Sequence, residues 1–176
     1  TNEYTPSKTC LSKQITKHLN FRLSGQRIKL SSQTKYLGIT LDKNLDFKKH
    51  LNDIKVKLNR ANCILSKVRN YVTQDLLKII YHAVFESHLR YGCQIWGQSQ
   101  NQTFINLERL QNKALRIINF KGARHDSTQL YKETGIFKLK DIIKISNCQL
   151  DLNQLNNNLP YVFHIYFTEL QENHGH

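Results

Sequence analysis

The hydrophobic residues of this chain follow a two-residue period at the start. Apolar and polar side chains alternate over residues 19–30, around Ser24-Gly25, and this pattern predicts a hairpin with a tight turn. Alternation resumes over residues 36–41 and predicts a third strand, with Leu37 on its apolar face. Gly38 falls inside that strand, where a glycine marks either a bulge or a close approach by another backbone.

A longer period begins at Phe47. From there to Val68 the apolar residues recur at steps of three and four, which predicts an amphipathic helix that Asp46 can cap. The apolar stripe of this helix consists of Phe47, Leu51, Ile54, Leu58, Ala61, Leu65 and Val68. Further helices are predicted over residues 73–89, 103–120, 127–134 and from 138, followed by a loop at 152–160 and an aromatic tail at 161–167.

These patterns predict a mainly α fold that starts with a short β-hairpin and strand segment. They divide the chain into a β segment over residues 1–43, a helical bundle over 44–121 and further helices over 122–176. The aromatic tail either docks back on the bundle or lacks its natural partner, and the sequence leaves both possibilities open.

Two short segments invite a functional interpretation, and each also has a structural one. The only tryptophan, Trp96, lies between two glycines in the segment 91–97, and a packed corner is favoured over a binding cage because its large apolar area needs burial. Asp42 and Asp46 form a carboxylate pair, for which we favour a role in the turn and the helix cap over metal binding.

The charge balance points to a polyanionic partner. The chain has 26 Lys and Arg against 13 Asp and Glu, a formal net charge of +13, which favours nucleic acid over other anionic surfaces. On the predicted helix, Lys49, Arg60 and Lys67 share the side opposite the apolar stripe, and Lys57 lies at its flank. A row of phosphate contacts and an ordinary solvated face explain this pattern equally well.

Other classes of protein find no support in the sequence. No apolar run reaches the ~18 residues of a membrane span, and we expect an intracellular protein, nuclear or cytoplasmic, with no membrane partner. The four cysteines are too widely spaced for a zinc site, and no Gly-rich phosphate loop or HExxH motif occurs. Because the chain begins at Thr1 and contains no Met, we expect a piece of a longer product.

Several motifs, taken in order, resemble one family. The chain resembles the C-terminal part of the reverse transcriptase of non-LTR retrotransposons of the jockey-like group. Each motif alone is weak, and their order along nearly the whole chain makes the set specific. The motifs are Pro6-Ser7-Lys8-Thr9, Lys35-Tyr36-Leu37-Gly38-Ile39-Thr40-Leu41-Asp42, Leu45-Asp46-Phe47-Lys48-Lys49-His50-Leu51, His88-Leu89-Arg90-Tyr91-Gly92, Ile95-Trp96-Gly97, the segment 107–118, the segment 130–139 and Leu159-Pro160.

The resemblance implies roles that composition does not provide. Tyr36-Leu37-Gly38 corresponds to the primer grip of the palm, so residues 1–43 would be a palm remnant. Residues 44–121 would be the thumb, which holds the template–primer duplex by its phosphates, and Lys57 would belong to that surface. Lys8 corresponds to a lysine that assists pyrophosphate departure as a proton donor.

The resemblance also implies what this chain lacks. Nucleotidyl transfer by two Mg²⁺ ions needs paired carboxylates, and no Asp-Asp occurs in the sequence. We therefore expect no cofactor in this fragment, Mg²⁺ in the full polymerase, and no catalysis by the fragment alone. Its expected partners are an RNA–DNA or DNA template–primer duplex and the missing N-terminal fingers and palm.

Two other hypotheses remain open at this stage. The chain could be a non-enzymatic helical module, derived from such an element, that binds protein or RNA through the tail and the Trp96 corner. It could also be the sequenced end of an intact polymerase, which the upstream reading frame would decide.

Overall fold

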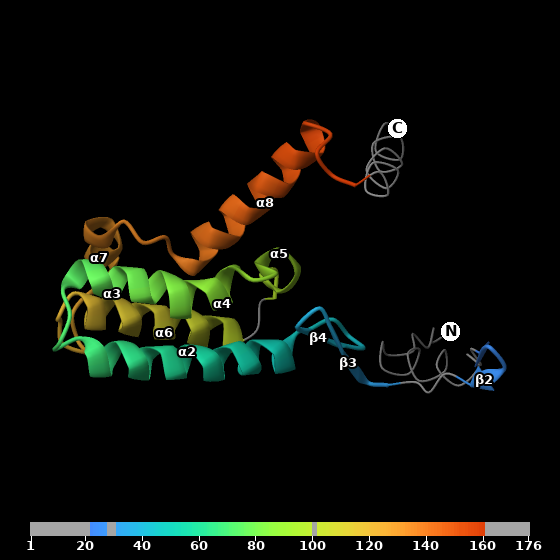
Figure 1. The fold of residues 1–176 in the computed structure, drawn as a ribbon, viewed down its shortest axis with the longest axis horizontal. Helices are drawn as coiled ribbons and strands as arrows, with labels where there is room; N and C mark the ends of the chain where they lie inside the picture. The colour runs from blue at the N-terminus through green and yellow to red at the C-terminus, as the bar shows by residue number, and fades with distance from the viewer. Residues whose placement is uncertain (1–21, 28–30, 100–101, 161–176) are drawn as a thin grey trace, which may run out of the picture.

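A computed structural model describes residues 22–27, 31–99 and 102–160 (Figure 1). Lys8 and the aromatic tail lie outside the described residues, so their predicted roles stay predictions. The described chain is mainly helical, with short antiparallel hairpins before the helices, which confirms the predicted fold class. The strands are β1 (Arg22–Leu23), β2 (Gln26–Arg27), β3 (Gln33–Tyr36) and β4 (Ile39–Asp42). The helical elements are α2 (Lys48–Val68), α3 (Gln74–Tyr81), η1 (His82–Glu86), α4 (Ser87–Arg90), α5 (Cys93–Trp96), α6 (Gln102–Ile118), α7 (Ser127–Thr134) and α8 (Leu139–Leu155).

The predicted third strand over residues 36–41 is wrong. Strands β3 and β4 pair antiparallel with Tyr36 opposite Ile39, so the chain reverses at Leu37 and Gly38. Both turn residues have positive φ, 43° and 80°, which is the requirement of a type I′ turn. Leu37 continued the apolar alternation, but it is 72% exposed at the tip of the hairpin. An unbroken two-residue period cannot reveal a turn that is two residues long.

Helix α2 lies side by side with α6 along one edge of the bundle (Figure 1). Leu51, Leu58 and Leu65 of α2 have no exposed surface, and the whole predicted stripe is buried or partly buried. Full burial of a leucine side chain contributes about 1.5–3 kcal/mol. The apolar stripe therefore accounts for both the position of α2 and the exposure of its opposite, cationic side.

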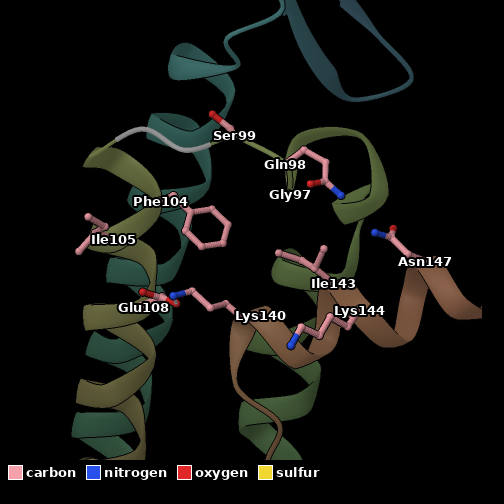
Figure 2. A pocket seen from close by; sticks show the side chains of 10 residues that line it. All are labelled: Gly97, Gln98, Ser99, Phe104, Ile105, Glu108, Lys140, Ile143, Lys144 and Asn147. Atoms are coloured by element: carbon pink, nitrogen blue, oxygen red, sulfur yellow. Dashed lines mark ion pairs between the residues drawn. The ribbon is translucent and has the colours of Figure 1, made fainter.

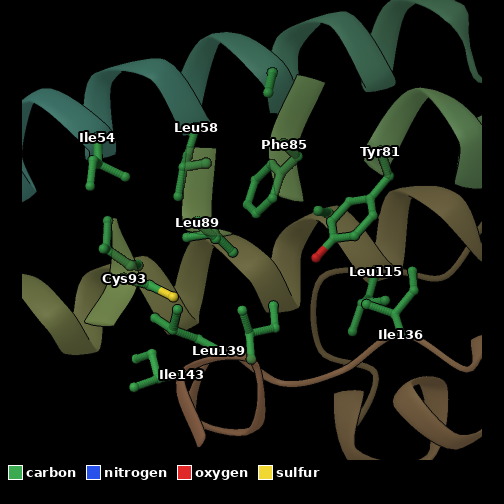
Figure 3. Packing of buried hydrophobic residues seen from close by; sticks show 14 of the residues in the cluster. Ile54, Leu58, Tyr81, Phe85, Leu89, Cys93, Leu115, Ile136, Leu139 and Ile143 are labelled. Carbon is green, nitrogen blue, oxygen red and sulfur yellow. The ribbon is translucent and has the colours of Figure 1, made fainter. Parts of the chain in front are cut away.

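The second predicted helix is interrupted by one turn of π-helix, η1. Leu77, Tyr81, Phe85 and Leu89 are all fully buried at steps of four residues, and Figure 3 shows the last three in one cluster with Leu115. In an α-helix of 3.6 residues per turn, a four-residue step drifts by about 40° each time. The wider turn of η1 takes up part of that drift.

The spacing of apolar residues in this segment also predicts burial of Leu76 and Ala83, and both predictions are wrong. Leu76 is 43% exposed, and Ala83 is exposed as well. Both residues fit the buried face of a regular helix, but that face follows the four-residue repeat instead.

The corner at Trp96 is a packed one, as predicted. The indole is fully buried, and its Nε1–H donates to the Tyr91 carbonyl at 2.9 Å. The Trp96 side chain itself therefore offers no surface to a protein partner, whereas Tyr91 and Ile95 of the same corner are exposed. The hypothesis of an interaction through the tail and this corner stays a prediction.

The C-terminal elements match their predicted bounds except at the end. Helix α7 occupies the predicted residues and stops at Gly135, which has a φ of 70°. Helix α8 continues to Leu155 instead of yielding to a loop at residue 152, because the backbone hydrogen bond from Asn156 N–H to the Leu152 carbonyl is still formed. Its far end stands clear of the other helices (Figure 1).

Gln111 links four elements inside the core. It is fully buried on α6, and its amide donates to the Tyr81 hydroxyl of α3 at 2.9 Å and to the Phe137 carbonyl at 2.8 Å. Its Oε1 accepts from the Tyr131 hydroxyl of α7 at 3.1 Å and from the Leu139 N–H at the start of α8 at 2.9 Å. All four hydrogen-bonding positions of the amide are thus occupied.

Replacement of Gln111 by Leu keeps the side-chain volume and removes these bonds. We expect the free energy of unfolding to fall by about 3 kcal/mol, since buried partners are left unsatisfied at about 1–3 kcal/mol each. Urea denaturation measures the loss, with Gln149→Leu at an exposed position of α8 as the control. Equal stabilities of the two variants would contradict this role for Gln111.

Candidate nucleic-acid interface

The Asp42 carboxylate organises the connection between β4 and α2. Its Oδ1 accepts from the N–H groups of Asn44 at 3.0 Å and Asp46 at 3.2 Å, and its Oδ2 accepts from Phe47 N–H at 2.9 Å. Asp46 Oδ1 in turn accepts from the N–H of Lys48, the first residue of α2, at 3.1 Å, and this bond holds the pKa of Asp46 below its ordinary value. The predicted role of the two carboxylates in the turn is confirmed. The predicted cap at Asp46 is wrong by one residue, because the N-cap position is Phe47, whose side chain makes no cap hydrogen bond.

Tyr91 holds the tip of the β3–β4 hairpin against the end of α4. Its hydroxyl donates to the Leu37 carbonyl at 2.5 Å. A Cβ added to Gly38 would lie 3.3 Å from Tyr91 Cε1, and the φ of 80° at Gly38 is itself costly for other residues. Gly38 is therefore required by the turn and by the approach of a tyrosine ring, and the predicted bulge or backbone approach is wrong.

A groove lies between this hairpin, α2 and α4. It consists of two cavities of about 280 Å³ and 360 Å³ that share the side chains or backbone of Lys35, Gly38, His50, Ile54 and Lys57. The first cavity adds Asp53, Val56 and Arg60, and the second adds Ser87, His88 and Tyr91. We refer to these residues together as the hairpin groove.

Three of the predicted nucleic-acid contacts meet in the hairpin groove, namely Gly38, Lys57 and Arg60. The other predicted residues lie outside it. Tyr36 and Leu37 are exposed at the hairpin tip. Lys49 and Lys67 are exposed on α2, about 12 Å before Lys57 and about 10 Å after Arg60 at 1.5 Å per residue.

Sequence reasoning missed Lys35, His50, His88 and Tyr91 as groove residues. All four residues lie inside the motifs quoted above, so their positions were visible although their shared location was not. His88 and Tyr91 come from another helix, and only the packing of α4 beside α2 brings them to the groove.

The groove and the exposed side of α2 carry unneutralised positive charge. In the part of the chain that the structure describes, no ion pair involves Lys35, Lys49, Lys57, Arg60 or Lys67. The acidic side chain that lines the groove is Asp53. Such free cations are available to phosphate groups, whose neutralisation releases counterions.

His50 lies on the α2 side of the groove and is only 6% exposed. The Thr40 N–H donates to its Nδ1 at 3.4 Å, and the Trp96 ring centroid lies 6.3 Å from its own. Burial lowers the pKa of His50, and the charges of Lys57 and Lys35 lower it further, against the opposing effect of Asp53. Burial and Lys57 also lower the pKa of His88.

A separate cavity of about 500 Å³ lies between α6 and the start of α8 (Figure 2). Phe104 and Ile143 face it from opposite sides, and Lys140 Nζ lies 3.5 Å from Glu108 Oε1 across its edge. It contains none of the residues that the sequence predicted for nucleic-acid binding.

Two kinds of feature, a membrane-spanning helix and a metal-binding cluster, are not found among the described residues. Within residues 22–27, 31–99 and 102–160, no helix combines the length and the hydropathy that crossing a membrane requires. The same residues contain no group of three His, Cys, Asp or Glu side chains placed to hold a metal ion.

The chain is similar in sequence to RNA-directed DNA polymerases of mobile elements. It is 35% identical over 88 residues to the probable RNA-directed DNA polymerase from transposon X-element of Drosophila melanogaster, which covers 48% of this chain and 10% of the relative. It is 32% identical over 139 residues to the RNA-directed DNA polymerase from mobile element jockey of the same species, which covers 76% of this chain and 15% of the relative. No protein-family profile matches the chain, and no solved structure matches it significantly.

These similarities confirm the resemblance to the reverse transcriptases of jockey-like non-LTR retrotransposons. The polymerase from transposon BS of Drosophila melanogaster adds a third relative, 29% identical over 125 residues. The chain spans only 10% to 15% of the length of these three relatives. The functions of these whole proteins are therefore applied to this chain only as a proposal.

The contact between Gly38 and Tyr91 predicts that substitution by alanine lowers the free energy of unfolding by different amounts at Gly38 and at Gly135. Gly135→Ala meets open space at a φ of 70°, so it should lower the free energy of unfolding by about 1 kcal/mol through backbone strain alone. Gly38→Ala adds the displacement of the Tyr91 ring and should cost about 2 kcal/mol. Urea denaturation compares them, and equal losses would show that Tyr91 does not constrain the hairpin.

The lowered pKa of His50 predicts loss of stability in acid. An unfolded chain takes up a proton at the ordinary histidine pKa of 6.5, whereas folded His50 does so only at lower pH. The free energy of unfolding should therefore decrease as the pH falls below about 6.5. The groups that face His50 are Lys35, Asp53, Lys57 and the Trp96 ring.

Urea denaturation at about pH 7.5 and about pH 5.5 measures this dependence. His50→Asn should weaken the pH dependence of the free energy of unfolding. His125→Asn, at an exposed position, should leave this pH dependence closer to that of the unchanged chain. His88 contributes in the same direction, so some dependence should remain in His50→Asn. An unchanged pH profile in that variant would contradict the assignment to His50.

Proposed function

We propose that this chain is the primer-grip, thumb and post-thumb part of an RNA-directed DNA polymerase. Its function is to hold a template–primer duplex, in the hairpin groove and along the exposed side of α2. The observation that carries the proposal is the meeting of Gly38, Lys57 and Arg60 in one cationic groove. The similarity to polymerases of mobile elements supplies the class of ligand.

The cations of α2 are spaced to follow a nucleic-acid backbone. From Lys49 to Lys67 the helix rises about 27 Å, at 1.5 Å per residue, which matches about eight base pairs at 3.4 Å each. Lys57 and Arg60 lie between these ends and reach the groove. A duplex lying along α2 would meet several lysine and arginine side chains in succession, without any contact to base edges, so binding should be independent of sequence.

The hairpin is held in place before any ligand arrives. Asp42 ties its second strand to the start of α2, and Tyr91 ties its tip to the end of α4. A groove of fixed shape loses less conformational entropy on binding than a mobile loop would. This supports the assignment of Tyr36, Leu37 and Gly38 to the primer grip.

The proposal assigns binding to this chain and catalysis to another part of the polymerase. Mg²⁺-dependent transfer would use paired carboxylates, whereas Asp42 and Asp46 accept backbone hydrogen bonds in the turn. Fingers and palm from the same polyprotein would be the protein partners, and Lys8 would serve as the proton donor in the assembled site. We assign residues 1–43 to the palm, 44–121 to the thumb and 122–176 to the post-thumb region, in a nuclear or cytoplasmic protein.

Charge reversal in the groove tests the proposal. Lys57→Glu with Arg60→Glu should weaken binding to an RNA–DNA duplex at least tenfold. It should also reduce the slope of log affinity against log salt by about 2, because each lost phosphate contact contributes about 0.9. Fluorescence anisotropy with a labelled duplex, between about 50 and 200 mM salt, provides both quantities.

The matched control is Lys121→Glu with Lys132→Glu, two exposed lysines away from the groove with the same change in net charge. A second pair, Lys49→Glu with Lys67→Glu, tests the rest of the α2 surface and should also reduce the slope. Affinity that does not depend on salt, or equal effects of the groove pair and the control pair, would contradict the proposal.

A further inference from the structure

His50 has one ring nitrogen with a partner and one without. Nδ1 accepts the Thr40 N–H. In a neutral imidazole with Nδ1 as the acceptor, the proton is on Nε2. Nε2 is buried and has no hydrogen-bond partner. A buried donor of this kind destabilises the fold when it stays unpaired.

The position of His50 separates it from other buried groups without a partner. Asn62 Oδ1 and Arg69 Nε are also unpaired, but neither residue lines the hairpin groove. His50 lines both cavities of the groove, together with Lys35 of β3 and Lys57 of α2. The residue that carries this unpaired donor therefore lines a cavity that a ligand can enter.

The charges around the groove select the kind of ligand. Lys35, Lys57 and Arg60 would repel a cation and attract an anion, against a single lining carboxylate, Asp53. Burial and the two lysines lower the pKa of His50, so at neutral pH the imidazole is uncharged and keeps its Nε2 proton. A neutral N–H donor beside flexible cations suits a phosphate, which needs both charge neutralisation and a directed hydrogen bond.

We propose that His50 Nε2–H donates a hydrogen bond to a phosphate oxygen bound in the hairpin groove, where Lys35 and Lys57 neutralise the phosphate charge. This inference rests on the proposed function in taking the phosphate from the backbone of a nucleic-acid strand. A free phosphate has the same chemistry, and the experiment below distinguishes the two sources.

Two substitutions separate the two nitrogens. His50→Asn places an amide oxygen near the position of Nδ1, so it keeps an acceptor for the Thr40 N–H and removes the distal donor. His50→Gln places an amide nitrogen near the position of Nε2, so it keeps the distal donor and loses the acceptor. A purely structural histidine would be replaced better by Asn, whereas a phosphate-binding histidine would be replaced better by Gln.

The test uses the whole folded chain with ¹⁵N-labelled histidine. An RNA–DNA duplex and inorganic phosphate are titrated separately while the His50 Nε2 resonance is followed by NMR, and duplex affinity is measured by anisotropy. We expect the duplex to shift the Nε2 resonance, His50→Asn to weaken duplex binding about tenfold, and His50→Gln to weaken it less. The tenfold loss corresponds to one charge-assisted hydrogen bond.

The outcomes distinguish this inference from the proposed function. Normal duplex binding with no shift at Nε2, and full affinity in His50→Asn, would overturn the inference and leave the proposed function standing. A saturable shift with inorganic phosphate but no duplex binding would support the phosphate site and overturn the proposed function. The absence of any shift with either ligand would overturn the inference. This measurement uses the unchanged chain, so it does not depend on whether a variant folds.

Discussion

Burial of one apolar stripe on α2 against α6 is the constraint on which the rest of this structure depends. The stripe covers the whole length of the helix, with Leu51, Leu58 and Leu65 fully buried. An amphipathic helix that buries one side in the core leaves its other side exposed to solvent. The exposed side of α2 carries Lys57 and Arg60, so the same packing that stabilises the bundle also determines where the positive charge lies.

The hairpin is held in place by two contacts, one at the start of α2 and one at the end of α4. Asp42 binds three backbone N–H groups at the start of α2, and Tyr91 binds the Leu37 carbonyl at the tip. Gly38 permits both the turn and the approach of the tyrosine ring. The groove between hairpin and helices is thus a consequence of the fold.

Polar groups inside the molecule divide into two kinds. Gln111 has a partner at every hydrogen-bonding position and joins α3, α6, α7 and α8 within the core. His50 has a partner at Nδ1 alone. A satisfied amide stabilises a single arrangement of helices. The unpaired donor of His50 belongs to a residue that lines a cationic cavity, and the proposed phosphate contact rests on that combination. This contrast, rather than burial alone, singles out His50.

The sequence by itself determined the fold class, the apolar stripe of α2, the bounds of α7 and the cations of α2, because these depend on the period and spacing of neighbouring residues. Only the tertiary structure decided that Leu37 and Gly38 form a turn, that Leu76 is exposed beside a π-turn, and that His50 meets the groove. Those features depend on contacts between segments distant along the chain, such as Tyr91 with the hairpin. Local sequence patterns do not contain information about such contacts. The hydrophobic period therefore predicts the helices, whereas the groove depends on how the helices and the hairpin pack.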